Sequence, residues 1–348
     1  MSIVFMEGFD YYNGVGPNTG MTSRWTSSSR SGLVAGRFGG QAIQHNTDTA
    51  TSGFSICLLE SSVTSFACGF ALKLPFFGTA GANNGGVFGF YNSTNAQFAF
   101  TIRPNAFAGI DIYRQTGINS AATIVGSTAN NILRLSTWHY IECVCDISTT
   151  SGSIKLWVDG AQVLNLSNVN NQAGISDVVD SIVCGWFGSV GGGGSNQIDD
   201  IYVTDTSVRI GERKIETLYP NSDIAQGFIR SSGTSNFSLV DDPQTNTTDY
   251  VIGTAPGDTD TYGFTNLTTV PTFVDAVQVN TVAMKTDAAT RNISIQLISG
   301  PTVDDGPDFA LSGSYNRYGR LVIEDPNTGS TWTASAVNNI QGGPKVAS

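Results

Sequence analysis

The chain has 348 residues and a formal net charge of −11, with 40% hydrophobic and 13% charged residues. It carries no run of Lys and Arg, which argues against nucleic-acid binding. No apolar run approaches the ~20 residues of a membrane-spanning helix, so we expect no membrane insertion. The 40 glycines, together with many Ser, Thr and Asn residues, predict an all-β protein rich in turns.

The N-terminus reads MSIVFMEGFD and lacks the basic and apolar regions of a secretory signal peptide. We therefore expect the chain to be made and folded in a cytosol, or to leave it by another route. Its length suits two domains of ordinary size.

Alternating apolar and polar residues predict a series of short strands in the first part of the chain. These strands are Phe66–Leu74, Val87–Tyr91, Gln97–Ile102, Gly109–Tyr113 and Ile182–Phe187. Gly191–Gly194 follows them and precedes a further strand that opens at Ile198. A phosphate-binding loop precedes a helix instead, so this glycine run is interpreted as a mobile loop.

The stretch from Thr137 to Asn165 organises this part, because it predicts three consecutive antiparallel strands. In the first strand, Trp138–Ile147, alternation assigns one apolar face and one solvated face. The apolar face carries His139, Ile141, Cys143, Cys145 and Ile147. The other face carries Trp138, Tyr140, Glu142, Val144 and Asp146.

The next strand, Ser153–Val158, precedes Asp159-Gly160, a strong signal for a type I′ hairpin turn. A two-residue turn there predicts that Leu156 pairs with Val163 and Trp157 with Gln162. We therefore expect the hairpin Ile154–Leu164 to lie centrally in a sandwich, with Cys143 and Cys145 in its core.

A domain boundary is predicted after Asp205, giving domains 1–205 and 206–348. Gly211–Leu218 is predicted to be a short helix that ends before Pro220. The remaining elements are again strands: Phe228–Ser231, Tyr250–Ile252, Ala276–Met284, Ile293–Ser299 and Leu321–Glu324. Asp325–Gly329 has turn chemistry, so Thr331–Val337 is predicted as the return strand.

Several of these stretches resemble the concanavalin A-like jelly roll, the lectin-like sandwich of laminin-G domains and pentraxins. They are WHYIE, GSIKLWVDGAQV and IDDIYVTD (Ile198–Asp205), which looks like the closing strand, together with FMEGFD (Phe5–Asp10) and GRFGGQAI (Gly36–Ile43), which look like opening strands. The resemblance implies a jelly-roll β-sandwich over residues 1–205 and a β-rich, sandwich-like second domain.

The second part resembles a module of tailed-bacteriophage structural proteins through GERKIETLYPNSD, VDD with TDYV, AVQV and EDPNTGSTWT. In such proteins this module commonly follows a jelly roll that opens like MSIVFMEGFDYY. The resemblance implies a virion protein of the tail or tail fibre, without catalytic residues to transfer. It implies other virion proteins and further copies of the chain as partners, with a trimer as the first expectation.

Catalytic patterns are missing from the sequence, so we expect no enzymatic activity. Jelly-roll glycanases place two or three acids on one strand, whereas the first domain has only Glu7, Glu60 and Glu142. Glu142 and Asp146 come nearest to that pattern and are interpreted as part of a solvated face. A Ser-His-Asp site is disfavoured because His45 and His139 are the only histidines and no G-x-S-x-G elbow occurs.

The cysteines and the acidic clusters were weighed as metal ligands. Cys57, Cys68, Cys143, Cys145 and Cys184 lack paired Cys/His spacing, so reduced, buried thiols are predicted rather than zinc ligands. Four clusters of aspartates could bind Ca²⁺ through their carboxylate oxygens. The alternative is that these aspartates stabilise turns and cap helices. These candidates are Asp199/Asp200, Asp241/Asp242, Asp258/Asp260 and Asp304/Asp305/Asp308. None forms an EF-hand loop, so no cofactor is expected.

The sequence does not exclude sugar binding, because exposed aromatic rings and Asn side chains are sufficient to contact a sugar. The eligible residues are Tyr91, Asn92, Trp157 and Trp186, and core packing is the alternative for the aromatic ones. The sequence thus favours a virion structural protein, with a host-glycan role in addition. A true lectin, a capsid-decoration protein and a glycan depolymerase are the alternatives.

Overall fold

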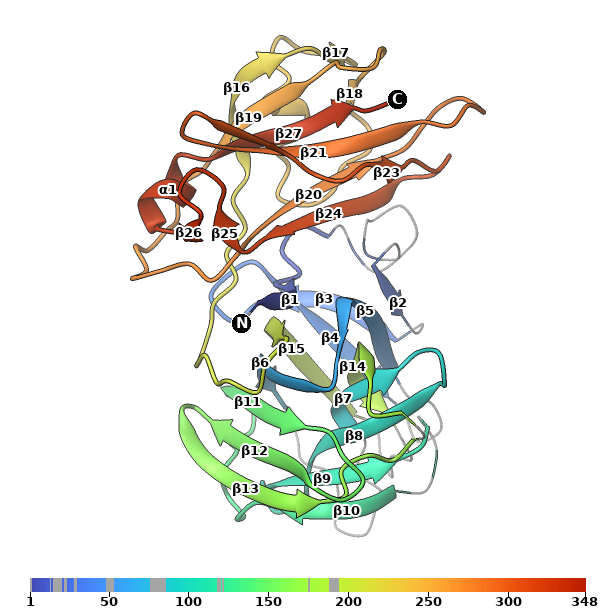
Figure 1. Cartoon of the computed structure of the whole chain (residues 1–348), viewed down its shortest axis with the longest axis vertical. Coiled ribbons are helices and arrows are strands. Elements are labelled where there is room, and N and C mark those ends of the chain that lie inside the picture. Colours follow the sequence, from blue (N-terminus) through green and yellow to red (C-terminus); the bar gives the residue numbers. More distant parts are fainter. Residues whose placement is uncertain are drawn as a thin grey trace. The chain divides into compact units, whose positions relative to one another are not determined.

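The computed structural model describes residues 2–12, 14, 21, 24–27, 30–47, 53–75, 86–117, 120, 122–174, 176–187 and 194–348. The chain divides into two compact units (Figure 1). Unit 1 comprises Met1–Phe9 and Trp25–Ile215, and unit 2 comprises Asp10–Arg24 and Glu216–Ser348. The division therefore falls after Ile215 rather than after Asp205, and the segment between β1 and β2 groups with the C-terminal unit.

Unit 1 contains an eight-stranded antiparallel sheet, sheet A, with the order β13-β12-β11-β6-β15-β4-β3 and with β1 also paired to β15. Its strands are β1 (Ile3–Glu7), β3 (Ser31–Ala35), β4 (Gln41–Thr47), β6 (Ser65–Lys73), β11 (Trp138–Asp146), β12 (Gly152–Val158), β13 (Ala161–Val169) and β15 (Gly194–Thr204). The strands predicted near the start and end of the jelly roll meet here, because β15 pairs with β1, β4 and β6.

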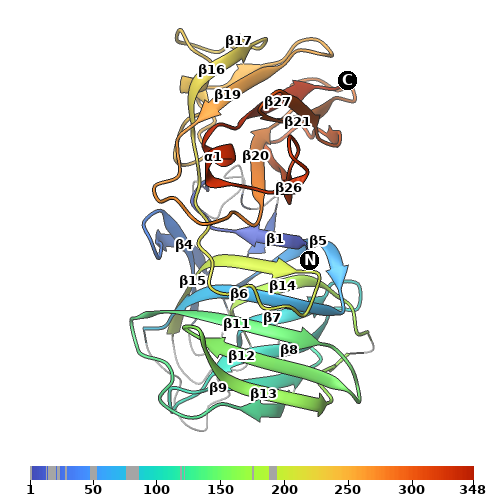
Figure 2. The same ribbon diagram turned by 60° about the vertical axis from the view of Figure 1, so that its left-hand side comes forward.

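The second sheet of unit 1, sheet B, has seven strands in the order β10-β9-β8-β7-β14-β5-β2. They are β2 (Trp25–Ser27), β5 (Gly53–Val63), β7 (Gly86–Asn92), β8 (Gln97–Pro104), β9 (Ile110–Gln115), β10 (Ala122–Ser127) and β14 (Val179–Phe187). Figure 2 shows β11, β12 and β13 of sheet A in front of β8 and β9 of sheet B. The predicted all-β class and the jelly-roll sandwich are confirmed.

Aromatic side chains fill the space between the two sheets. Phe70 of β6 stacks on Phe88 of β7 with 4.2 Å between ring centroids, and Phe66 lies 4.5 Å from Phe90. All four rings are fully buried. Such rings each remove a large apolar area from water and prefer offset or edge contacts, so the two sheets are held face to face.

The hairpin between β12 and β13 turns at Asp159-Gly160, as predicted. Both residues have positive φ, 49° and 81°, which a type I′ turn requires. Trp157 pairs with Gln162 as expected, but Leu156 pairs with Leu164. The predicted pairing with Val163 is wrong because a β-bulge inserts one extra residue into β13 at this point. The predicted central position of the hairpin is also wrong, because β13 is the outermost strand of sheet A and the hairpin forms an edge of the sheet.

Strand β11 is buried on both faces, which corrects the prediction of a solvated face. Ile141, Cys143 and Cys145 lie in the core as expected, and all five cysteines are buried, with none of them in a disulfide bond. On the opposite face, however, Tyr140 and Glu142 are at most 1% exposed. Alternation along a strand separates its two faces but does not tell whether another segment covers the outer one.

Unit 2 is built on a six-stranded sheet in the order β16-β19-β27-β21-β22, with β23 also paired to β21. Its strands are β16 (Pro220–Gln226), β19 (Asp260–Phe264), β21 (Asn292–Ser299), β22 (Thr302–Asp305), β23 (Phe309–Ala310) and β27 (Gln341–Val346). Three two-stranded ribbons accompany it: β17 (Ile229–Arg230) with β18 (Val251–Ile252), β20 (Val277–Ala283) with β24 (Asn316–Val322), and β25 (Glu324–Asp325) with β26 (Ser330–Thr331).

The core of unit 2 lies between the six-stranded sheet and the β20–β24 ribbon. Val279 of β20 packs with Ile295 and Leu297 of β21, and Trp332 is fully buried in the same cluster. The indole of Trp332 donates a hydrogen bond to the carbonyl oxygen of Val322 at 3.1 Å. Unit 2 is therefore β-rich and sandwich-like, as predicted.

Two predicted elements of the C-terminal region are wrong. Gly211–Leu218 forms no helix but runs as an irregular segment, in which the amide of Ile215 donates to the Asp200 carboxylate at 2.7 Å. A two-turn helix is marginal without packing, so tertiary hydrogen bonds decide its conformation. The predicted return strand Thr331–Val337 is wrong beyond Thr331, the last residue of β26. Thr333 instead caps the short helix α1 (Ala334–Asn338). A single 3₁₀ turn, η1 (Phe237–Leu239), also belongs to unit 2.

No helix among the described residues is long and apolar enough to cross a membrane. The predicted glycine-rich loop Gly191–Gly194 lies outside the described residues, apart from Gly194 at the start of β15.

Replacing Gly160 by Ala should destabilise the protein by about 1 kcal/mol, because Ala is strained at positive φ. A Cβ atom at this position would meet no heavy atom within 4 Å, so the backbone conformation alone carries the cost. Denaturant unfolding followed by tryptophan fluorescence would measure the change.

Gly32→Ala is the matched control, since Gly32 in β3 also has no atom within 4 Å of its ideal Cβ and has no positive φ. We expect its stability to stay within ~0.5 kcal/mol of the parent. Equal losses in both variants would contradict the assignment of the turn.

Candidate functional site

The outer face of sheet A is closed by the chain itself. The segment after β15, residues 205–215, crosses this face and belongs to unit 1. Arg209 of this segment forms an ion pair with Glu142, donating from Nε at 3.1 Å and also from Nη2. The Arg209 guanidinium lies 5.1 Å from the ring centroid of Trp157. Glu142 is thus a buried structural carboxylate rather than part of a solvated face.

Tyr202 completes this contact from β15. Its hydroxyl lies 3.3 Å from Oε1 of Glu142 and 3.2 Å from the carbonyl oxygen of Gly211. Room for its ring comes from Gly69, where a Cβ atom would approach the ring to 2.3 Å. Burial raises the pKa of Tyr202, and the Glu142 carboxylate raises it further, so the phenol stays protonated and available as a donor.

A second ion-pair group fixes the other end of the crossing segment. Arg37 pairs with Glu212 and lies 3.7 Å from the Asp200 carboxylate. The Asp199 carboxylate accepts from the amide of Arg37 at 2.8 Å. These contacts and those of Glu142 with Arg209 and Tyr202 hold residues 205–215 over the outer face of sheet A around Glu142.

The outward positions of sheet B carry a mixed set of aromatic and polar side chains, half of which are buried. We call this set the sheet B platform. It consists of Phe54, Ile56 and Leu58 of β5, Tyr91 of β7, Phe98, Thr101 and Arg103 of β8, Asp111 and Tyr113 of β9, and Val183 of β14. The ladders align these positions, pairing Thr101 with Tyr113 and Arg103 with Asp111.

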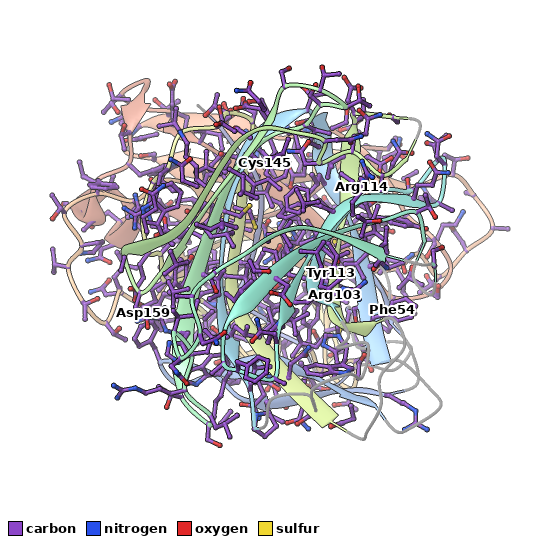
Figure 3. All side chains as sticks on the ribbon, turned by 90° about the horizontal axis from the view of Figure 1, so that it is seen from below. Phe54, Arg103, Tyr113, Arg114, Cys145 and Asp159 are labelled. Carbon is purple, nitrogen blue, oxygen red and sulfur yellow. The ribbon has the colours of Figure 1, made fainter. Side chains whose placement is uncertain are left out.

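The polar end of the platform is centred on Arg103. Its guanidinium lies 4.3 Å from the centroid of the Tyr113 ring, and its Nε donates to the Thr101 hydroxyl at 3.1 Å. Arg103 is 4% exposed, whereas Tyr113 is half-buried. Figure 3 shows these two residues together, with Phe54 also labelled on β5. A cation–π contact of this kind holds the ring in one orientation.

The apolar end of the platform is a small cluster that is separate from the main core. Tyr91, Phe98 and Val183 are buried in it, and Phe54 and Ile56 pack against them half-buried. The rings of Tyr91 and Phe98 meet edge to face with 5.0 Å between centroids. Beside them, Leu58 is 62% exposed. Apolar side chains on the outside of a sandwich are a feature of binding surfaces.

The ionisation of the platform suits binding rather than proton transfer. Burial lowers the pKa of Arg103 to about 10, so the guanidinium stays charged at neutral pH. Burial raises the pKa of Tyr113 and of Tyr91, with smaller contributions from Asp111 and Asp180 respectively. Both phenols are therefore neutral, and a carboxylate pair of the glycosidase type does not occur among the platform residues.

Neither histidine lies on the platform. His139, on the predicted apolar face of β11, is buried with both ring nitrogens in contact: its Nε2 accepts from the amide of Arg134 at 2.8 Å, and its Nδ1 lies 2.7 Å from the Asp159 carboxylate. His45 shares a 2.9 Å hydrogen bond with Ser55, but both residues are fully buried. Burial lowers the pKa of His45 to about 3, so it is a neutral group of the core.

Three of the four acidic clusters predicted as calcium ligands accept hydrogen bonds or form ion pairs with protein groups, and the Asp199/Asp200 contacts are given above. Asp258 accepts from the amides of Thr254 and Ala255 at 2.9 and 2.8 Å, which is turn chemistry. Asp260 is buried and accepts from the Tyr262 hydroxyl at 2.7 Å. Asp304 and Asp305 pair with Arg320 and Lys345 respectively. Among the described residues, no three His, Cys, Asp or Glu side chains gather closely enough to hold a metal ion.

Most residues proposed from sequence for sugar contact are buried. Tyr91, Asn92 and Trp186 are 9%, 8% and 2% exposed, and Trp157 lies beneath Arg209. Sequence reasoning missed Arg103 and Tyr113. Their spacing on separate strands gives no local motif, and only the register of β8 and β9 brings them together.

No protein-family model matches the sequence, and no curated protein sequence matches it. Solved structures are similar at a low level. "Structure of alginate lyase Aly36B" is 12% identical, covers 60% of this chain and 98% of that chain, and has a TM-score of 0.42. "Cellulose induced protein, Cip1" is 13% identical, with coverages of 55% and 95% and a TM-score of 0.41. Lectin II from Ulex europaeus is 13% identical, with coverages of 59% and 100% and a TM-score of 0.38.

Glu142→Gln should destabilise the protein by roughly 2–4 kcal/mol, because it leaves the Arg209 guanidinium without its buried counter-charge. This expectation replaces the small effect that a solvated carboxylate would give. Urea unfolding would measure it. Glu212→Gln, in the same segment but with a side chain 47% exposed, should cost less than about 1 kcal/mol. Similar losses for the two variants would contradict the buried-pair assignment.

Proposed function

We propose that this protein is a non-enzymatic structural component of a tailed-phage virion, in the tail or tail fibre, whose jelly roll binds a host-surface glycan. The glycan part of the proposal rests on the Tyr113 ring, which Arg103 supports from within sheet B. A ring fixed in this way stacks on a sugar with little loss of side-chain entropy. Phe54, Ile56 and Leu58 add apolar side chains along β5, which β8, β7 and β14 separate from β9 in the sheet.

The virion part of the proposal rests on the sequence resemblance. The stretches that carry it have definite places in unit 2: AVQV enters β20, and EDPNTGSTWT forms the β25–β26 hairpin and buries Trp332. A protein of this kind meets other virion proteins and copies of itself, with a trimer as the first choice. It would be made in the host cytoplasm and act without a cofactor.

A true lectin and a capsid-decoration protein remain the alternatives. The first would bind a glycan outside any particle, and the second would be located on the head. A depolymerase is disfavoured by the chemistry of the platform, which offers neutral phenols and a guanidinium but no pair of carboxylates suited to acid and base roles.

Tyr113→Ala should weaken glycan binding at least tenfold, equal to about 1.4 kcal/mol, because it removes the supported ring. Tyr113→Phe should retain most of the affinity, since stacking needs the ring and not the hydroxyl. Binding would be measured on a glycan array and then by calorimetry with each glycan bound. Tyr250→Ala is the control, because Tyr250 is an exposed tyrosine of unit 2, 42% exposed. A blank array with the parent protein would remove the glycan part of the proposal.

Mass spectrometry of purified phage particles should find peptides from both units at a copy number divisible by three. Cryo-EM of the same particles should place the protein on the tail. Density on the head would favour capsid decoration, and absence of the peptides from particles that infect normally would contradict the virion assignment.

A further inference from the structure

An exposed isoleucine adjoins Tyr113 at the edge of sheet B. Strand β10 is the outermost strand of this sheet and pairs with β9, so that Ile124 is directly opposite Tyr113. Side chains at facing positions of a ladder lie on the same face of the sheet, with Cβ atoms about 5 Å apart. Ile124 is 54% exposed, and Tyr113 is half-buried. Exposed apolar residues that occur singly need no explanation, but this one widens the apolar surface beside the Tyr113 ring.

The next row on the same face is polar. Asp111 lies two residues before Tyr113 in β9 and therefore points to the same side of the sheet. Ser127 of β10 is opposite Asp111, because a β-bulge after Ile124 keeps Ser127 on this face. Ser127 is exposed, whereas Asp111 is half-buried and faces Arg103 across the β8–β9 ladder. The row therefore offers the Ser127 hydroxyl, and in part the Asp111 carboxylate, to the hydroxyl groups of a sugar.

The turn between β8 and β9 carries an exposed aromatic residue, Phe107, on a fixed backbone. Phe107 is 60% exposed. Its amide donates to Oδ1 of Asn105 at 3.0 Å, and its carbonyl oxygen accepts from the amide of Asn131 at 2.9 Å. The same Asn105 oxygen accepts from the amide of Gly109 at 2.9 Å. A Cβ atom at Gly109 would lie 2.9 Å from Nδ2 of Asn105 and from the carbonyl oxygen of Ala129, so glycine makes room here for the Asn105 side chain. A ligand that covers Phe107 therefore orders no further backbone, which favours binding.

Tyr113 and Phe107 are too far apart along the hairpin for one sugar ring to cover both. Residues of a strand rise about 3.3 Å each, so Tyr113 lies roughly 10 Å from Ile110, where β9 begins. Phe107 lies in the turn before Ile110, beyond the end of the strand. A ligand that contacts both rings must therefore be a chain of sugars that runs along β9.

We infer that the glycan-binding site of unit 1 is extended along β9 and takes an oligosaccharide of three or more sugars, with one sugar on Tyr113 and Ile124 and another reaching Phe107. This inference rests on the proposed glycan-binding function and specifies its ligand by chain length. The sugar between the two rings would bring its hydroxyls to Ser127. Affinity should therefore rise with chain length, whereas a site limited to Tyr113 would bind a disaccharide as well as a longer chain.

Calorimetry with size-graded oligosaccharides tests the dependence on chain length. The full chain would be titrated with oligosaccharides of one to six sugars, prepared from cellulose, mannan, polygalacturonate and the polysaccharide that gives the strongest array signal. We expect the affinity to rise about three- to tenfold between the disaccharide and the tetrasaccharide, which is the increment of one additional aromatic contact. Beyond the length that reaches Phe107, the affinity should level off.

Phe107→Ala should remove this increase and leave binding of the disaccharide unchanged, because only longer chains reach the turn. Phe107→Tyr keeps a ring at the same place and should retain the increase. Ile124→Ala should weaken binding at all lengths alike, by about two- to fivefold, since it removes apolar area beside Tyr113. Phe38→Ala is the matched control, because Phe38 is 57% exposed in the turn between β3 and β4 of sheet A. It should leave binding unchanged at every length.

The outcomes separate the extended site from the function on which it rests. An affinity that does not rise beyond the disaccharide, or a rise that persists in Phe107→Ala, would overturn the extended site while binding that depends on Tyr113 stands. A parent protein that binds no glycan on the array or in solution would overturn glycan binding and the extended site together.

Discussion

The structure of unit 1 depends on aromatic packing between its two sheets. Phe66 of sheet A lies 4.5 Å from Phe90 of sheet B, and Phe70 lies 4.2 Å from Phe88, measured between ring centroids. These buried rings exclude water from the space between the two sheets. Each sheet consequently turns one face inward, and the function of the unit depends on what becomes of the two outer faces.

The outer faces of the two sheets differ in what lies against them and in the side chains they carry. Sheet A is covered by residues 205–215 of its own chain, which bring Arg209 to Glu142, and a buried carboxylate requires such a partner. Sheet B instead carries aromatic rings and one guanidinium on its outside. A ligand-binding surface needs side chains that are fixed in orientation and still partly accessible. Tyr113 is of this kind, because its ring packs on the Arg103 guanidinium and is half-buried.

In the function proposed above, the platform supplies aromatic rings for stacking, and its cation Arg103 is buried beside Asp111. A receptor-binding part of a particle would profit from such a rigid surface, because little side-chain entropy is lost on contact. Unit 2 contributes a second core around Trp332, which lets it fold around its own apolar cluster.

The sequence by itself determined the local features: the all-β class, the turn at Asp159-Gly160 and the inward position of Cys143. These follow from the period of two and from backbone preferences, which act over neighbouring residues. Only the tertiary structure decided the irregular course of Gly211–Leu218, since its partners are Asp200 of β15 and Arg37 in the turn after β3. Likewise, the meeting of Arg103 and Tyr113 depends on the register between two strands, which no local pattern encodes.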